Sequence, residues 1–170
     1  MEGVELEYRA VLSLIYSELV ADLKSLHVIY EETPSCISMA SALAALLMNR
    51  GVSVSASPVS KLGKPVESAF LAMGPYRDDL AEAVAAVLPL VEKTAVLHTP
   101  AYYAAEELRD FPKMIEGKEV RYAVREEPGE ITFYKVVSRG GDLEKSAIGR
   151  RRLTGAESEV IRRYESLHAI

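Results

Sequence analysis

The hydrophobic and polar positions between residues 27 and 54 follow a strand, turn, helix and strand pattern. His27-Val28-Ile29-Tyr30 is a short β-prone run, and the residues from Ile37 to Arg50 are nearly all small or apolar. Gly51 follows at once, as expected just past the end of a helix. The pattern predicts a βαβ unit. Its turn, at residues 31–36, would lie at the carboxyl edge of a parallel sheet, where open α/β folds bind ligands.

Upstream of this unit, residues 5–26 carry apolar side chains at helical spacing, with Arg9, Ser13 and Ser17 off the apolar face. Downstream, the pattern alternates between short apolar runs and helical segments. We expect strands at 52–56, 68–73 and 94–98, a strand end at Gly74-Pro75, and helices from Asp78 onwards and over 101–114.

The pattern changes after residue 118. Runs at 120–124 and 131–137, joined through Pro128-Gly129, favour an antiparallel hairpin. A basic loop containing Gly140-Gly141 and a closing helix over 155–168 are expected to follow. The predicted fold is therefore α/β in three layers with a mainly parallel sheet, plus a C-terminal antiparallel hairpin and a terminal helix.

Length and composition indicate a soluble globular protein. The 170 residues suit a single domain, which we divide into an α/β core at 1–118 and a hairpin with a basic helical appendage at 119–170. Apolar residues make up 49% of the chain, and no run approaches the roughly 18 residues that span a membrane. The acidic start, Met1-Glu2-Gly3-Val4-Glu5, is unlike a signal peptide. We expect a cytoplasmic protein without membrane contact.

The turn at 31–36 holds the first candidate chemistry, including the sole cysteine of the chain, Cys36. A nucleophilic cysteine needs a nearby histidine to lower its pKa, and the candidates are His27, His98 and His168. The alternative is a small buried residue at the start of a helix, which is the commoner role for a lone cysteine.

The block from Ser35 to Val52, Ser-Cys-Ile-Ser-Met-Ala-Ser-Ala-Leu-Ala-Ala-Leu-Leu-Met-Asn-Arg-Gly-Val, resembles the first motif of the DHH phosphoesterase superfamily, which includes RecJ nucleases. In that family a strand ends in a His-x-Asp-x-Asp-Gly turn, followed by an apolar helix, a glycine and a second strand. Two later segments keep the family's order. Phe70-Leu71-Ala72-Met73-Gly74 resembles a strand ending in Leu-Asp-x-Gly, and Ala95 to Pro100 takes the place of the Asp-His-His signature.

The resemblance implies a site for two metal ions, conventionally manganese, that activate water on a phosphodiester. Threonine, serine, alanine and proline cannot replace the anionic ligands that hard divalent cations require. The resemblance therefore predicts a protein without phosphoesterase activity, catalytic residues, metal or cofactor. The positions matching the family's ligands are Glu31, Thr33, Ser35, Ala72, His98, Thr99 and Pro100.

An inactive core of this kind has a counterpart in the replisome factor that accompanies the replicative helicase with the GINS complex. By that analogy we expect a non-catalytic binding protein in DNA replication or repair, with GINS or helicase subunits as partners. A homo-oligomer is left open. The candidate ligand-binding residues are Glu31, Thr33, Ser35, Cys36, Ser38, His98 and Thr99.

A second hypothesis is a sugar-phosphate-binding enzyme or sensor of the SIS type. A hydroxyl-rich turn before a helix can receive phosphate through side-chain hydroxyls and free backbone N–H groups. Thr33, Ser35, Ser38 and Ser41 supply such hydroxyls, although Glu31 and Glu32 put negative charge beside them.

A third hypothesis is nucleic-acid binding by the C-terminal part. The chain carries a net charge of −5, yet residues 131–170 contain eight Lys or Arg against five Asp or Glu, which is +3. Tyr122, Phe133 and Tyr134 lie on the predicted strands nearby, and rings with basic neighbours can bind single strands of DNA or RNA. A solvated surface is the commoner role of such charges. The candidate residues are Arg139, Lys145, Arg150, Arg151, Arg152, Arg162 and Arg163.

Overall fold

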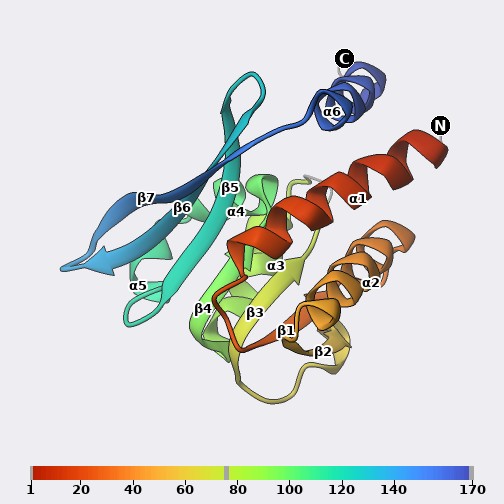
Figure 1. Ribbon diagram of the computed structural model, residues 1–170. Helices are drawn as coiled ribbons and strands as arrows, with labels where there is room; N and C mark the ends of the chain where they lie inside the picture. Colours follow the sequence, from red (N-terminus) through yellow and green to blue (C-terminus); the bar gives the residue numbers. More distant parts are fainter. Residues whose placement is uncertain (1, 75–76, 169–170) are drawn as a thin grey trace.

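The structure, a computed structural model, describes residues 2–74 and 77–168 and shows the predicted α/β fold (Figure 1). Pro75, expected at a strand end, lies outside the described residues. The helices are α1 (Glu2–Leu19), α2 (Pro34–Asn49), α3 (Leu80–Val87), α4 (Thr99–Glu106), α5 (Phe111–Met114) and α6 (Gly155–His168). The strands are β1 (Ser25–Tyr30), β2 (Ser53–Pro58), β3 (Val66–Ala72), β4 (Val91–Leu97), β5 (Glu119–Glu127), β6 (Glu130–Arg139) and β7 (Asp142–Arg152).

The strands form one seven-stranded sheet in the order β2-β1-β3-β4-β5-β6-β7. Neighbouring strands from β2 to β5 are parallel, whereas β5–β6 and β6–β7 are antiparallel. The predicted hairpin turns at Pro128-Gly129 and is confirmed. Since β5 pairs with both β4 and β6, the antiparallel strands continue the parallel sheet edge to edge.

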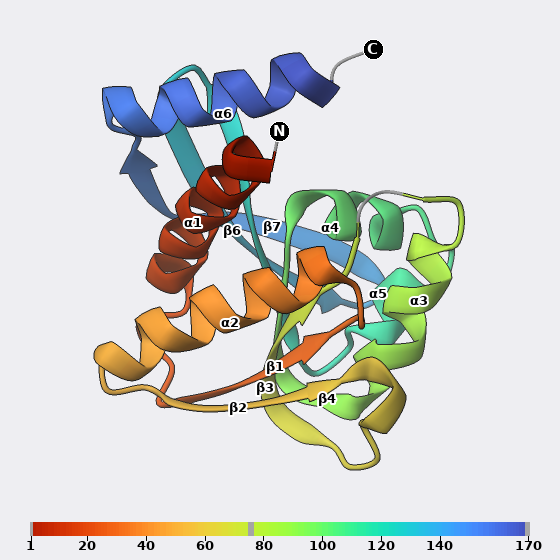
Figure 2. The same ribbon diagram turned by 90° about the vertical axis from the view of Figure 1, so that its right-hand side faces the viewer.

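Helices cover both faces of the sheet, as predicted for three layers. On one face, which we call the α1 face, Val28 and Phe70 pack in a core that includes residues of α1, α2 and α6. On the opposite face, the α4 face, Ile29 and Leu71 pack against residues of α3, α4 and α5. Figure 2 shows α1 and α2 side by side, with α6 against α1. Among the described residues, no helix combines the length and apolar character needed to cross a membrane.

Local sequence signals explain where α2 starts and stops. The Thr33 hydroxyl caps the helix by accepting a hydrogen bond from the Cys36 N–H (3.2 Å), and Pro34 occupies the first turn, where its missing N–H costs nothing. After the helix, Gly51 takes a positive φ of 82°, which glycine adopts without steric cost. Thr33 and Gly51 therefore mark the two ends of α2.

The first helix differs from its prediction at both its end and its faces. It ends at Leu19 rather than continuing to residue 26, and β1 begins at Ser25. Ser13 and Ser17, expected off the apolar face, are fully buried. Their hydroxyls donate to main-chain carbonyls within the helix, at 2.8 Å and 2.7 Å. Serine can pack in a core in this way because the helix itself satisfies its hydroxyl.

Two further predictions are wrong. The helix expected over 101–114 is interrupted, and the structure has α4 and the short α5 instead. The segment after Gly140-Gly141, predicted as a basic loop, is the eleven-residue edge strand β7. Strand β7 is exposed on most of its length, so it lacks the apolar alternation by which strands are recognised.

Candidate functional site

The carboxyl ends of β1, β3 and β4 meet at the point where the chain reverses its winding. The connection from β1 to β2 runs through α2 on the α1 face, while β3 connects to β4 through α3 on the α4 face. A crevice forms between strands where such connections diverge, and open α/β sheets bind ligands there. Glu31, Gly74 and His98 directly follow these strands or lie within two residues of their ends.

A cavity of about 240 Å³ lies at this edge, on the α1 face. It is smaller than the roughly 300–1,000 Å³ of pockets for drug-sized ligands, so its volume suits a small metabolite. Side chains from α1, α2 and α6 and the ends of β3 and β4 enclose it. The lining residues are Tyr8, Arg9, Leu12, Tyr16, Ser35, Cys36, Met39, Phe70, Ala72, Met73, Gly74, His98, Thr99, Pro100 and Tyr164.

Arg9 brings a positive charge to the cavity. Its side chain is only 16% exposed, and its guanidinium donates to the Ser35 carbonyl (2.9 Å) and the Ser35 hydroxyl (2.6 Å). The third contact is an ion pair with Glu5 at 2.6 Å, on the exposed side of α1. Arg9 therefore ties α1 to the first turn of α2 and holds its charge beside the cavity.

His98 packs directly against Gly74. The His98 Nε2 hydrogen-bonds to the Met73 carbonyl, which leaves Nδ1 as the acceptor of the ring. A Cβ atom at position 74 would lie 3.1 Å from His98 Cε1, and Gly74 has a φ of 142°. Burial lowers the pKa of His98 to about 4, so the imidazole is neutral at pH 7.

The other reactive groups of the cavity are also bonded to main-chain carbonyls. The Cys36 thiol lies 3.5 Å from the Gly74 carbonyl, and the Thr99 hydroxyl donates to the Ala123 carbonyl. Tyr16 is 2% exposed, and burial raises the pKa of its hydroxyl. These contacts fix the walls of the cavity.

Glu31 lies beside the cavity without lining it. Its carboxylate accepts hydrogen bonds from the Gly74 N–H (3.0 Å) and from both terminal nitrogens of Arg77. Burial raises the pKa of the Glu31 carboxyl, but the bonds from Arg77 and Gly74 outweigh this and lower it. The ion pair between Glu31 and Arg77 joins the end of β1 to the segment after β3, so its role is structural.

The structure brings four of the seven predicted ligand-binding residues together, namely Ser35, Cys36, His98 and Thr99. Glu31 is adjacent, Thr33 caps α2, and Ser38 does not line the cavity. Within residues 2–74 and 77–168 no three His, Cys, Asp or Glu side chains are placed to hold a metal ion.

Of the histidines considered for activating Cys36, His98 lies near it and His27 does not. His98 shares its cavity, whereas His27 hydrogen-bonds Ser55 and Ser57 on β2, both at 2.6 Å. The side chain of His168 lies outside the described residues. Cys36 is buried, in keeping with the alternative of a small core residue.

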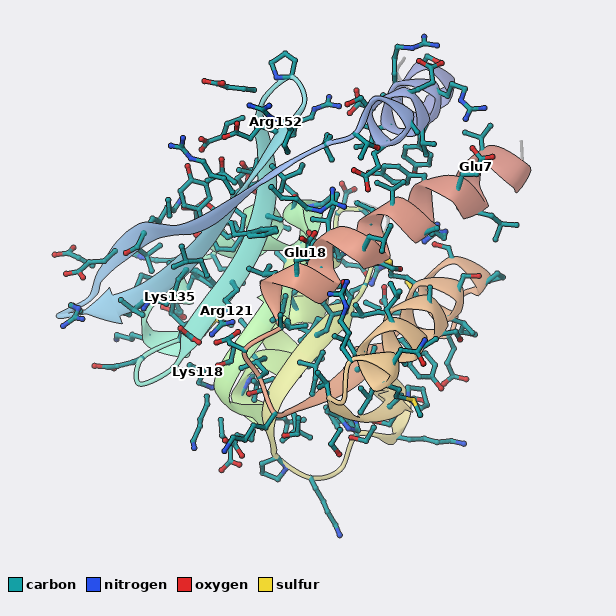
Figure 3. All side chains as sticks on the ribbon, in the orientation of Figure 1. Glu7, Glu18, Lys118, Arg121, Lys135 and Arg152 are labelled. Atoms are coloured by element: carbon teal, nitrogen blue, oxygen red, sulfur yellow. The ribbon has the colours of Figure 1, made fainter. Side chains whose placement is uncertain are left out.

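The predicted nucleic-acid-binding residues do not form a free basic surface. Arg151 is 17% exposed and is held between Glu18 and Glu157. Only Arg152 forms no ion pair among the described residues, and it lies at the end of β7 (Figure 3). The other five are paired, Arg139 with Glu144, Lys145 with Glu106, Arg150 with Glu130, Arg162 with Glu159 and Arg163 with Glu7.

Sequence reasoning missed the contribution of α1 and α6 to the cavity. Tyr8, Leu12 and Tyr16 follow one another at four-residue spacing and so share a face of α1. Tyr8 stacks on Tyr164 of α6 with ring centroids 3.7 Å apart. The spacing was visible in the sequence, but the pairing of two helices separated by more than a hundred residues was not.

No family model and no curated protein matches this chain. Among solved structures it is similar to a crystal structure from Rhodospirillum rubrum assigned as a branched-chain amino acid ABC transporter, with 16% identity and a TM-score of 0.43. The match covers 93% of this chain and 42% of that one, so the chain spans less than half of that protein's length. A similarity of this size carries no argument about function.

Proposed function

We propose that this protein binds a small organic acid in the cavity between α1, α2 and the carboxyl ends of β3 and β4, without converting it. The observation that carries the proposal is a single half-buried cation, Arg9, beside a cavity whose other walls are mostly apolar. An arginine in such surroundings favours a carboxylate, which it can hold with two parallel hydrogen bonds.

The backbone adds to the attraction for an anion. Helix α2 is 16 residues long and starts at the cavity with Ser35 and Cys36. The positive end of its dipole therefore faces the same space as the Arg9 guanidinium. Glu5, the carboxylate now bound to Arg9, is 44% exposed, so water can solvate it when a ligand takes its place.

The apolar part of the ligand would contact aromatic rings. Tyr16 and Phe70 pack edge to face with centroids 5.2 Å apart on the floor formed by α1 and β3, and Tyr8 and Tyr164 stack above α1. Rings supply a large contact area with little loss of side-chain entropy. These walls favour an acid with an aliphatic or aromatic body over a highly hydroxylated one.

Binding is favoured over catalysis because the reactive groups are already engaged. His98 is neutral and hydrogen-bonded to Met73, and Thr99 and Cys36 contact other main-chain carbonyls. A nucleophile would instead be hydrogen-bonded to its base, whereas Cys36 and Thr99 donate to Gly74 and Ala123 and not to His98.

The test compares acids with their own amides. Thermal unfolding is measured with a series of aliphatic and aromatic monocarboxylates and with the corresponding primary amides, which have the same shape without the charge. We expect at least one acid to raise the Tm by several degrees at a concentration of about one hundred times its Kd, a stabilisation of about 2.7 kcal/mol. The corresponding amide should raise the Tm by less.

Arg9→Gln should abolish the preference for the acid. Arg162→Gln is the matched control, since it removes one positive charge from an exposed ion pair on α6. If no acid stabilises the protein, or if Arg9→Gln retains the full effect, the proposal is wrong.

Two of the three hypotheses drawn from the sequence concern this part of the molecule or its partners. Of the four hydroxyls suggested for a sugar phosphate, only that of Ser35 lines the cavity, and it is bonded to Arg9. A role in DNA replication with GINS or helicase partners stays a prediction that rests on the resemblance alone.

A further inference from the structure

We propose a second binding site, for a phosphate group, at the opposite edge of the sheet from the organic-acid cavity. The site is an open hollow of about 540 Å³ at the amino ends of β4 and β5, beside the carboxyl end of β6. The residues that matter to the argument are Lys93, Thr94, Lys118, Glu119, Ser138 and Arg139. The ligand is inorganic phosphate or pyrophosphate, or the phosphate of a small phosphorylated molecule.

The charge of the hollow is positive in a protein whose net charge is −5. Three cations, Lys93, Lys118 and Arg139, line it together with one carboxylate, Glu119. The Glu119 carboxylate is already engaged by Arg121 (2.9 Å) and by the Thr94 hydroxyl (3.0 Å). Glu119 is therefore already paired, and of the three cations only Lys118 forms no ion pair among the described residues.

Lys118 is the central observation. Its ammonium is half-buried and donates to the Leu88 carbonyl at 3.0 Å, and it forms no ion pair among the described residues. Burial lowers the pKa of Lys118, as expected for a cation that loses water without gaining a counter-charge. An anion in the hollow would supply that counter-charge.

The other two cations are free to turn toward a ligand. Lys93 pairs with Glu67 at 3.0 Å and Arg139 with Glu144 at 2.9 Å, and all four side chains are more than half exposed. Exposed ion pairs of this kind are weak, because water competes for both charges. A phosphate with two negative charges offers each cation a stronger partner.

Other polar groups are within the same hollow. Ser138 supplies a hydroxyl, and Gly117 forms the turn before β5 with a positive φ of 79°. Figure 3 shows Lys118, Arg121 and Lys135 on the same side of the molecule as this turn. Lys135 lies opposite Arg121 in the register of β5 and β6, so it adds to the positive potential near the hollow.

The test is a calorimetric titration of the whole chain with pyrophosphate at constant ionic strength. We expect saturable binding, weakened at least tenfold by Lys118→Gln. Arg162→Gln is the control of equal charge, since Arg162 lies on α6, which is not part of the hollow. Far-UV circular dichroism checks that each variant is folded. If Lys118→Gln fails this check, Arg139→Gln is used and should weaken binding at least threefold.

The outcomes distinguish this site from the organic-acid cavity. Arg9→Gln should bind pyrophosphate normally, and Lys118→Gln should bind the organic acid normally. Tighter binding of adenosine monophosphate than of pyrophosphate would identify a phosphorylated small molecule as the ligand, and the reverse would identify the free anion. The absence of saturable binding of either probe, or equal binding by Lys118→Gln and Arg162→Gln, would overturn the proposal.

Discussion

Gly74 and His98 fit together at the carboxyl edge of the sheet because no side chain lies between them. A Cβ atom on residue 74 would be 3.3 Å from His98 Nε2, the atom that bonds to the Met73 carbonyl. The positive φ of Gly74 would strain any other residue there. The close contact leaves the imidazole little water, which explains why burial dominates its pKa.

His98 should make the stability of the protein depend on pH between neutrality and mild acid. Its folded-state pKa of about 4 is below the ordinary histidine value, so protons bind more tightly to the unfolded state. The contribution of neutral His98 to the stability of the protein is therefore complete above about pH 6.5 and is lost as the pH falls toward 4. From pH 7 to pH 5 we expect a loss of about 2 kcal/mol in the free energy of unfolding.

His98→Gln tests this prediction, because the glutamine amide can donate to Met73 without titrating. Urea unfolding at pH 7 and pH 5 should show a much smaller difference for the variant than for the parent protein. Equal differences would show that His98 is not the titrating group.

At the scale of elements, α6 is joined to the rest of the molecule by a few specific contacts. The Thr154 hydroxyl accepts from the Glu157 N–H (3.1 Å), and the Glu157 carboxylate accepts from the Thr154 N–H (2.9 Å). This reciprocal pair is a capping box. Arg151 of β7 binds the same carboxylate at 2.7 Å, so the strand and the start of the helix share one ion pair.

Thr154→Ala should loosen α6 without destabilising the sheet. Loss of a helix cap costs about 1 kcal/mol. Because α6 packs mainly against α1 and is not part of the sheet, we expect the loss as local opening, with amide exchange in α6 about fivefold faster. Thr33→Ala removes the equivalent cap from α2, which is packed in the core, and should lower the global stability instead. Unchanged exchange in α6 of Thr154→Ala would contradict this assignment.

For the whole molecule, hydrophobic patterning was enough to predict the layers, the parallel strands and the hairpin. Strands β1, β3 and β4 are buried runs, Gly51 marks the turn from α2 to β2, and Pro128-Gly129 marks the turn of the hairpin. Strand β7 could not be found in this way, because an exposed edge strand needs no apolar alternation. Its turn at Gly140-Gly141 was visible, but its pairing with β6 was not.

The site was predictable only in part, for a related reason. Ser35, Cys36, His98 and Thr99 follow strands, and strand order places strand ends together. Arg9, Tyr8 and Tyr164 come from helices at the two ends of the chain. Nothing local in the sequence indicates which face of the sheet a terminal helix will cover, so its contribution depends on tertiary packing.

Arg121 joins the parallel and antiparallel parts of the sheet to α1. It is 8% exposed, and its guanidinium donates to the Leu19 carbonyl at the end of α1 (3.0 Å) and to Asp22 (2.7 Å and 3.1 Å). It also forms an ion pair with Glu119, two residues before it on β5. Arg121 of β5 therefore caps the carboxyl end of α1, about a hundred positions earlier in the chain.

Because of this connection, the chain should unfold as one cooperative unit. Arg121→Met should therefore lower the free energy of unfolding of the whole chain. Removing one partner of a buried ion pair costs roughly 3–5 kcal/mol, and the exposure of Asp22 favours the lower end, about 3 kcal/mol. Urea unfolding followed by far-UV circular dichroism and by tyrosine fluorescence should give coincident transitions, both shifted to lower urea in the variant. Arg162→Gln, in an exposed pair, should change stability by no more than about 0.5 kcal/mol. Two separate transitions, with only one of them sensitive to Arg121→Met, would show that the parallel and antiparallel parts of the sheet are independent units.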